Sequence, residues 1–446
     1  MGNVLMLCLL VFSLYKWTQN KKSISFLFFL FCVCAGFRLI PAGLHTIKLQ
    51  DYALIYLFSI IIYSFLKGVN IIRISNTIVD KLVLILLIYW IIIFLGTLLF
   101  TDEQPILAFQ SFRFRLLFLV YFIIKDMSIQ QKRKVMYYLF GIILFASILY
   151  VLQPLGIHIY QGGVEEALYS NEQSRYRNAP LFIQLFIILL AASNFITNAK
   201  LKLISISIFL IALIIPMSRT PIIMLFLVLI TYMILSCKYK ILFKSIFIIS
   251  FALIICWPFL NYRFGATDTL GDIKSAVDFS EINNYDPNSS EGTFTFRMAM
   301  LHERITYLVN SNKILFGCGF IHEQSAYTRN LLNFRIGTIN QINDELAITY
   351  LDTPDLTWLT ILMRTGIIGV ILILILIFTI FGFLKKSEKS FYKAISLWII
   401  YLLLVSFSGD SLGFNSINNY VILFLTYHNF INKDESLKDK RKKYIY

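Results

Sequence analysis

The chain has 446 residues, of which 58% are hydrophobic and 16% aromatic, and its mean hydropathy is +0.73. Soluble globular domains contain roughly 45–50% apolar residues, so this composition excludes an ordinary soluble protein and indicates a polytopic membrane protein. The net charge of +15 comes without a basic soluble domain interleaved with aromatics, so we expect no nucleic-acid partner. The cysteines and histidines show no zinc-ligand spacing, and we expect no metal and no cofactor.

Apolar segments follow one another from the start of the chain and predict about thirteen membrane-spanning helices. The first lacks a basic start and a small-residue cleavage site, so we expect an uncleaved span rather than a signal peptide. Ten spans fall within residues 1–259 and three within 356–432, which predicts an all-α polytopic integral membrane protein. The spans lie near residues 2–15, 24–40, 52–66, 82–100, 106–124, 135–152, 180–197, 203–217, 221–236, 241–259, 356–383, 391–407 and 417–431.

Two further segments complete the predicted organisation. Residues 260–355 form one large extracytoplasmic loop, for which we expect a mixture of helix and coil, and residues 433–446 form a basic cytoplasmic tail. Within the large loop, the stretch from Phe296 to Val309 has helical periodicity. We expect this helix to end near Asn310.

The basic residues differ in type between the two predicted sides of the membrane. Cytoplasmic loops carry an excess of positive charge, and this rule places the N-terminus outside and the C-terminus in the cytoplasm. Lys then dominates the cytoplasmic loops, where its charge faces anionic lipid headgroups. Arg binds phosphate or carboxylate through two parallel hydrogen bonds, so its positions indicate an anionic, phosphorylated substrate met from the outer side. The Arg residues within spans or on the outer side are Arg38, Arg113, Arg115, Arg175, Arg177, Arg219, Arg263, Arg297, Arg304, Arg329, Arg335 and Arg364.

A charge within a membrane span costs about 2.5 kcal/mol or more and indicates function, and three of the arginines within predicted spans are candidates on this ground. Arg113 and Arg115 lie in the fifth span, and a spacing of two residues points them to opposite sides of a helix, so at most one faces a cavity squarely. Arg364 lies in the eleventh span. All three are candidate substrate-binding residues. Snorkelling or bundle contacts for the first two, and a structural ion pair for Arg364, remain open alternatives.

Three more arginines are candidates on the outer side. Arg219 lies at an outer helix end between Pro216 and Pro221, where topology needs no positive charge, and this favours function over a purely interfacial position. Arg297 enters at the start of the loop helix, on the side predicted to pack against the membrane bundle. Arg304, seven residues later, is a candidate substrate-binding residue, with a solvated surface position as the alternative.

Carboxylates immediately before the eleventh span are candidate general bases. The side chains of Asp352 and Asp355 would hang over an outer cavity, and burial beside arginines tunes such groups. A helix N-cap near Thr353 or Asp355 is the alternative, and the two roles can coexist. His302 and His322 rank below Asp355 as bases. No nucleophilic triad, phosphate-cradling glycine loop or ATP motif is found, so the energy must already reside in the substrate.

The order of these features resembles the O-antigen polymerase and O-antigen ligase superfamily, over about residues 200–385. The similarity lies in an arrangement: a Ser-Arg turn between two spans, an outer-loop helix that begins with Arg, a later Gly-x-Gly segment, and a closing segment that enters the next span. The corresponding residues are Ser218-Arg219-Thr220, Arg297, Ile314-Leu315-Phe316-Gly317-Cys318-Gly319-Phe320, Asp355-Leu356-Thr357-Trp358 and Arg364-Thr365-Gly366-Ile367-Ile368-Gly369.

The resemblance implies a GT-C-like glycosyltransferase architecture and a polysaccharide polymerase that joins undecaprenyl-diphosphate-linked oligosaccharide repeat units by inverting, metal-independent transfer. It also implies that Arg219 and Arg297 grip the diphosphate and that Asp355 is the catalytic base. In ligase members a His stands eleven residues before the first Gly of the closing segment. Asp355 holds that place here, as in many polymerase members, which favours a polymerase.

Location and partners follow from the same resemblance. We expect the bacterial cytoplasmic (inner) membrane, with undecaprenyl-diphosphate-linked oligosaccharides as substrates, membrane lipid around the spans, and a chain-length regulator and a flippase of the same pathway as partners. We expect the product to be an O-antigen, a capsule or an exopolysaccharide. The alternatives are an O-antigen-type ligase and, from another class, a lipid-linked oligosaccharide flippase or transporter, which has little use for a large outer loop rich in Arg and acidic residues.

Overall fold

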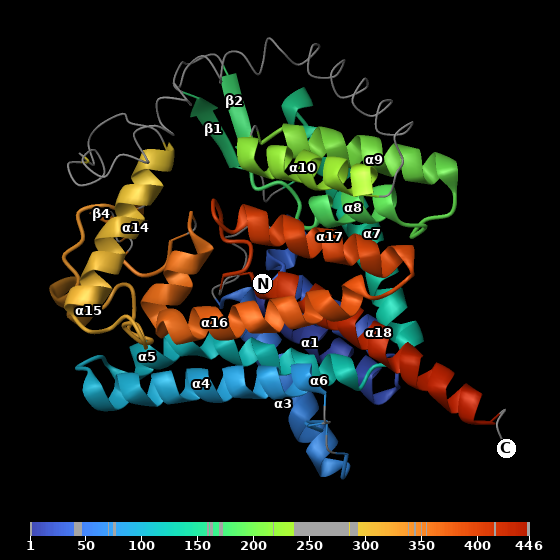
Figure 1. The fold of residues 1–446 in the computed structure, drawn as a ribbon, viewed down its shortest axis with the longest axis horizontal. Helices are drawn as coiled ribbons and strands as arrows, with labels where there is room; N and C mark the ends of the chain where they lie inside the picture. Colours follow the sequence, from blue (N-terminus) through green and yellow to red (C-terminus); the bar gives the residue numbers. More distant parts are fainter. Residues whose placement is uncertain are drawn as a thin grey trace.

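A computed structural model gives the fold of the chain (Figure 1). It describes residues 2–39, 47–69, 71–74, 77–157, 160, 164–168, 173–216, 218–235, 285, 293–337, 339–342, 345–348, 350–353, 355–413 and 416–443. The predicted tenth span, residues 241–259, lies outside these ranges. So does the large outer loop from residue 260 to 292, apart from Tyr285.

Helices dominate the described residues, which confirms a helical membrane protein. A perpendicular span needs about 20 residues, and five described segments are long and apolar enough to cross a membrane. Neither the count of thirteen spans nor the GT-C-like architecture is confirmed, and both stay predictions. The five segments are α3 (Leu49–Leu66), α4 (Ile78–Phe100), Pro105–Lys125, Ile129–Leu155 and α16 (Thr357–Lys385).

Two of these segments contain more than one helical element. Pro105–Lys125 consists of α5 (Pro105–Phe112), the 3-10 helix η3 (Arg113–Leu119) and α6 (Val120–Lys125). Ile129–Leu155 consists of α7 (Ile129–Val151) and a 3-10 turn, η4 (Gln153–Leu155). The fifth predicted span is therefore helical throughout but changes its pitch where Arg113 and Arg115 lie.

The remaining predicted spans outside residues 241–259 coincide with shorter helices, or with a helix that begins in the span and continues beyond it. The helix in the predicted span 24–40 is α2 (Lys22–Val33), which ends early because a left-handed 3-10 turn, η1 (Ala35–Arg38), follows it. All four residues of this turn have a positive φ. The helices are α1 (Gly2–Thr18), α2 (Lys22–Val33), α8 (Ile183–Ala192), α9 (Ala199–Ile214), α10 (Arg219–Leu235), α17 (Ser390–Val405) and α18 (Ile417–Lys443).

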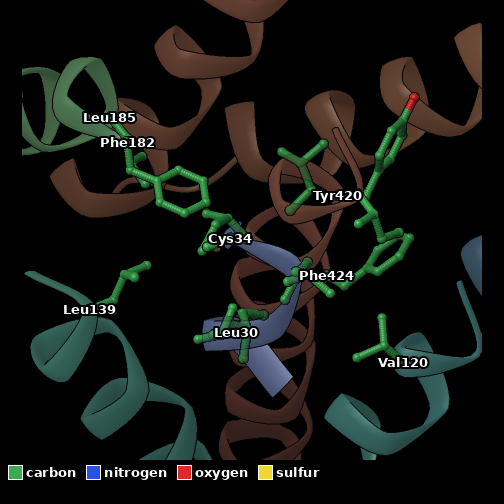
Figure 2. Packing of buried hydrophobic residues seen from close by; sticks show 14 of the residues in the cluster. Leu30, Cys34, Val120, Leu139, Phe182, Leu185, Tyr420 and Phe424 are labelled. Atoms are coloured by element: carbon green, nitrogen blue, oxygen red, sulfur yellow. The ribbon is translucent and has the colours of Figure 1, made fainter. Parts of the chain in front are cut away.

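The centre of the bundle is a continuous apolar core. Figure 2 shows Leu30 and Cys34, from and just after α2, lying between side chains of α6, α7 and α18 and of the start of α8. Leu30, Cys34, Val120, Leu139 and Leu185 are each fully buried. Segments far apart in the sequence thus share one core, which fixes the helix ends relative to one another.

Contacts between helix ends fall into the two groups that the alternation of charge predicts. At the predicted cytoplasmic end, Lys22 Nζ lies 2.5 Å from Asp126 Oδ2. At the predicted outer end, Thr357 Oγ1 donates to the carbonyl of Gly409 at 2.7 Å. Two further contacts lie at the predicted cytoplasmic end, Gln131 with Asn20 and Lys202 with Ser193. Two more lie at the predicted outer end, Tyr52 with Asn3 and Glu103 with Ser325. Which group faces the cytoplasm still rests on the charge rule.

The described elements of the large outer loop gather at one end of the bundle, where α4 ends and α5 and α16 begin (Figure 1). The predicted loop helix is present as α14 (Thr293–Asn310), which ends near Asn310 as expected, with Asn312 in a left-handed conformation and a Lys313 N–H to Leu308 O hydrogen bond of 2.8 Å. A second helix, α15 (Ala326–Leu331), follows.

The prediction of helix and coil for the outer loop did not include β-structure. The strands β3 (Ile339–Ile342) and β4 (Glu345–Ile348) form an antiparallel hairpin in which Ile339 pairs with Ile348. A second hairpin, β1 (Val164–Leu168) with β2 (Gln173–Arg177), lies between η4 and α8 in the sequence. Hairpins this short have too few alternating residues for the period-2 pattern to stand out.

Candidate active site

The first feature of the site is a break in α16 at Gly366. Its backbone has φ 64° and ψ −173°, inside an otherwise helical segment. This region of backbone space is open essentially to Gly alone. A Cβ at this position would lie 2.1 Å from the carbonyl oxygen of Leu315. The glycine therefore permits both the break and the close approach of a second chain segment.

The segment that approaches the break is the Gly-x-Gly stretch of the outer loop. Ile367 N–H donates to the carbonyl of Ile314 at 2.9 Å, and Cys318 N–H donates to the carbonyl of Met363 at 2.6 Å. Backbone groups freed by a break within a membrane must find partners in the protein, and residues 314–318 supply them here. Two motifs that lie some fifty residues apart in the sequence therefore form one unit.

Arg364, just before the break, is held by the outer loop. Its Nε donates to Asp352 Oδ1 at 3.0 Å and its NH2 group to Oδ2 at 2.5 Å. A third donor meets the carbonyl of Ile321, and Glu323 lies 4.0 Å away. The arginine side chain is only 2% exposed. Of the two alternatives for Arg364, the structure therefore displays the ion pair.

Glu323 holds the end of the outer loop over this pair. Its carboxylate accepts hydrogen bonds from the backbone N–H groups of Tyr350, Leu351 and Asp352. Burial raises the pKa of Glu323, and the neighbouring charge of Asp352 raises it further against the attraction of Arg364. Burial also raises the pKa of Asp352, but the Arg364 guanidinium outweighs burial, and the net direction is downward. This clamp had no signal in the sequence beyond an acidic residue soon after the Gly-x-Gly stretch.

Glu103, in the turn between α4 and α5, anchors the same loop to the bundle. Its carboxylate accepts from His322 N–H at 2.8 Å and from Ser325 Oγ at 2.7 Å. Burial, together with Arg364, lowers the pKa of His322, and its Nδ1 accepts from Gln324 N–H at 3.2 Å. His322 thus takes part in the turn that supports the site.

Arg297 and Asp355 meet at the outer mouth of the site. The NH2 group of Arg297 lies 3.4 Å from Asp355 Oδ1. The Arg297 side chain is 19% exposed and the Asp355 side chain 30%. The N-cap of α16 is Leu356, with no side-chain capping bond, so Asp355 does not cap this helix. The backbone N–H of Asp355 donates instead to Thr353 Oγ1 at 3.2 Å. A cation and a carboxylate are thus presented to the outside on a supported loop.

Arg304 is buried rather than solvated, contrary to the alternative considered for it. Its NH1 group lies 2.5 Å from Glu303 Oε2, and its guanidinium stacks 4.2 Å from the ring centre of Phe334. Glu303 also accepts from the backbone N–H groups of Arg335 and Ile336. Burial lowers the pKa of Arg304 to about 10, so it stays charged at neutral pH. Its contacts fix α14 against residues 334–336.

Arg113 and Arg115 meet different neighbours, as their spacing predicts. Arg113 Nε lies 3.1 Å from Asp51 Oδ1 of α3. Arg115 is buried, and its guanidinium lies 5.4 Å from the ring centre of Phe320, the residue that ends the Gly-x-Gly stretch. Arg115 is also close enough to Asp352 to favour its charged form. Of this pair, Arg115 belongs to the surroundings of the site.

Arg219 is the first residue of α10 and is partly buried. This helix packs against α8 and α17. The described contacts thus bring Arg297 and Asp355 together, while the participation of Arg219 stays a prediction.

Comparison with known proteins supports the resemblance. Residues 204–374 match a family model described as O-antigen ligase. This range begins within α9 and ends within α16, and it contains Arg219, Arg297, Arg304, Asp355 and Arg364. It lies within the predicted range of 200–385 and confirms the predicted superfamily for this part of the chain. No curated protein matches the chain.

Proposed function

We propose that the chain is a polysaccharide polymerase, and the match of residues 204–374 to a family model described as O-antigen ligase supports an enzyme of the O-antigen ligase and polymerase type. It would join undecaprenyl-diphosphate-linked oligosaccharide repeat units at the outer face of the bacterial cytoplasmic membrane. The observation that supports this most directly is the Arg297–Asp355 pair, 3.4 Å apart and partly exposed, which offers a phosphate ligand beside a proton acceptor within the matched domain.

In the proposed reaction, Arg297 and Arg219 bind the diphosphate that links the growing glycan to its lipid. In the part of the chain that the structure describes, Arg297 has one long contact, to Asp355, so an incoming diphosphate can compete for the guanidinium through two parallel hydrogen bonds. The exchange would bind the leaving group and release the Asp355 carboxylate. Substrate binding would thereby prepare the base.

The transfer step balances without a further reactant. A hydroxyl oxygen of the incoming repeat unit attacks the anomeric carbon on the face opposite the diphosphate and forms the new C–O bond. The bond from that carbon to the diphosphate breaks, and the diphosphate leaves with the electron pair, stabilised by the arginines. Asp355 takes the proton of the attacking hydroxyl. The anomeric configuration inverts.

The other arginines receive separate proposed roles. Arg364 holds the loop that carries Asp355. Arg304 holds α14, which carries Arg297. We therefore assign these two arginines to positioning rather than to direct substrate contact. Arg115 stays a proposed substrate contact, because it lies below the mouth of the site beside Phe320. The contact of Arg113 with Asp51 favours a role in bundle packing.

An O-antigen-type ligase is the second candidate, and the family description favours it. The two reactions share the lipid-linked donor and differ in the acceptor. Asp355, at the position where ligase members carry His, favours the polymerase. A ligase would leave long chains on the polyprenyl carrier when it is lost, whereas loss of a polymerase would leave single repeat units.

A deletion strain complemented with variants tests the proposal. Surface and lipid-linked glycans are sized on a gel for the deletion and for Arg297→Ala, Arg219→Ala and the control Arg335→Ala, whose exposed side chain lies in the same outer loop. We expect single repeat units without long chains in the first three and normal polymer in the control. Long carrier-bound chains would identify a ligase, and normal polymer from the well-expressed Arg297→Ala variant would refute the assigned site.

A further inference from the structure

A pocket of about 310 Å³ lies at the opposite end of the bundle from the Arg297–Asp355 pair. It is formed by the start of α7, the segment after α8, the start of α17 and the middle of α18, all on the side that the charge rule predicts to be cytoplasmic. Small-molecule sites occupy roughly 300–1,000 Å³, so the pocket can hold a group larger than a simple ion.

The polar part of the pocket is positively charged. Arg133 of α7 and Lys389 at the start of α17 line it, and no carboxylate is among the ten described residues that do so. Arg133 matters because Arg is scarce in the predicted cytoplasmic loops. Its planar guanidinium binds two phosphate oxygens at once.

The start of α17 adds a second source of positive potential. Lys389 is the N-cap of this 16-residue helix, and its own side chain makes no capping hydrogen bond. The first-turn residues Ser390, Phe391 and Tyr392 all line the pocket. Free N–H groups and the helix dipole make a helix N-terminus favourable for phosphate.

A buried amide points independently to a ligand. Asn429 of α18 lines the pocket and is 7% exposed. Its side-chain carbonyl oxygen has no hydrogen-bond partner among the described residues. Buried polar groups are normally satisfied. The other end of the amide is an NH2 group, which donates hydrogen bonds, so Asn429 can donate to a phosphate oxygen in the pocket that it lines.

The remaining wall is aromatic. The ring of Phe195 stacks on Tyr137 at 4.9 Å between centres and on Phe391 at 6.1 Å. Of these residues, Tyr137 is of a type that is enriched at the membrane–water interface. The pocket therefore presents a cationic and an apolar side together, which suits an amphipathic ligand better than free phosphate.

We propose that this pocket binds the phosphate headgroup of an anionic phospholipid from the cytoplasmic leaflet. Arg133, Lys389 and the α17 N-terminus would hold the phosphate, Asn429 would donate to it, and the aromatic wall would cover the glycerol and the first acyl carbons. Basic pockets between membrane helices on the cytoplasmic side bind lipid headgroups in this way. This lipid site is separate from the proposed glycosyltransferase site, and lipid binding would be a function in addition to glycosyl transfer.

Lipid binding to the purified full-length protein in detergent tests the proposal by native mass spectrometry and thermal shift. The probes are phosphatidylglycerol, zwitterionic phosphatidylcholine and inorganic phosphate. We expect phosphatidylglycerol to bind preferentially. The double variant Arg133→Gln/Lys389→Gln should weaken its binding by about tenfold or more, since it removes two charge-assisted contacts.

A matched double variant separates the pocket from general surface charge. Lys134→Gln/Lys393→Gln removes the same charge from the same two helices, at exposed residues outside the pocket, and should change binding by less than about twofold. Asn429→Asp, which puts a carboxylate into the pocket at nearly constant shape, should also abolish preferential binding. Equal losses in the two double variants, equal stabilisation by inorganic phosphate, or no preference for phosphatidylglycerol would each overturn the proposal.

Discussion

Two aspartates at the end of the outer loop lie three residues apart, and each contacts an arginine in a different way. Asp352 receives two hydrogen bonds, of 3.0 and 2.5 Å, from an Arg364 side chain that is 2% exposed. Among the described residues, the Asp355 side chain has one contact, of 3.4 Å, with an Arg297 side chain that is 19% exposed. The two aspartates are similarly exposed, at 37% and 30%, so the difference between the pairs lies in the arginines and in the number of bonds. The first arginine is held by three hydrogen bonds, whereas one contact of the second is found among the described residues.

The difference separates architecture from chemistry. A buried, doubly bonded arginine contributes little to ligand binding, because an entering phosphate would have to break both bonds. A partly exposed arginine with one long contact exchanges partners at small cost, since such pairs contribute only about 0–1 kcal/mol. Charged residues in one short segment can therefore serve opposite purposes, and matched substitutions can test the division.

The largest effect is expected from Gly366→Ala. This substitution disrupts the contact between the α16 break and residues 314–318, on which the positions of both aspartates depend. The new Cβ would lie 2.1 Å from a backbone oxygen, at a positive φ. We expect a loss of about 3–5 kcal/mol in unfolding free energy, seen as loss of monodisperse protein in size-exclusion chromatography. Gly382→Ala, in the same helix with open space around it, is the control. Full stability of Gly366→Ala would mean that the break does not position the site.

The second effect concerns Asp352→Asn, which leaves the guanidinium of Arg364 buried without its carboxylate. Removing one partner of a buried pair costs about 3–5 kcal/mol. We expect about 3 kcal/mol here, the low end of that range, because the Asp352 side chain is itself 37% exposed. Thermal unfolding in detergent measures the loss. An unchanged melting temperature would remove the distinction between the two aspartates.

The same substitution three residues later should behave in the opposite way. Asp355→Asn is expected to lower polymer formation by about 100-fold, the lower range for loss of a general base. Its unfolding free energy should stay within about 0.5 kcal/mol of the parent, because the lost contact is long and partly exposed. Polymer yield is measured in complemented cells, and thermal unfolding is measured on the protein purified from the same cells. Normal polymer, or a stability loss as large as that of Asp352→Asn, would contradict the proposed division.

The sequence predicts the parts of this arrangement that depend on local patterns. Hydropathy locates the described helices, the 3.6-residue period locates α14, and the order of motifs identifies Arg297 and Asp355, which lie together in the structure. Charge alternation predicts which helix ends share a side of the membrane. Each of these signals lies in a short stretch of chain.

The features that the sequence does not predict depend on long-range contacts. The eleventh span is expected as one continuous helix, because its hydropathy does not change at Gly366. Only the approach of residues 314–318 makes the break stable. The partner of Arg364 could not be assigned, because Asp352 and Asp355 both precede the span. Glu323 binds backbone N–H groups, and such contacts leave no trace in side-chain pattern.

The smallest expected effect tests whether Glu323 belongs to the buried half of the comparison. Its raised pKa means that the folded protein binds this proton more tightly than the unfolded chain, where Glu titrates near about 4.3. Its contribution to stability is therefore complete below that pH and is lost as the pH rises through the folded pKa. Asp352, with a lowered pKa, acts in the opposite direction, because its contribution is present above about 3.9 and is lost at lower pH.

Glu323→Gln removes only the first of these two titrations. The melting temperature of the variant should therefore rise relative to that of the parent as the pH increases from about 4.3 through the folded pKa, whatever the offset between the two proteins at low pH. Melting curves of both proteins between acidic and neutral pH measure this difference. A difference that stays constant would show that the Glu323 carboxylate is as well solvated in the folded protein as in the unfolded chain, and the clamp over Asp352 would then belong with the open, exchangeable contacts of Asp355.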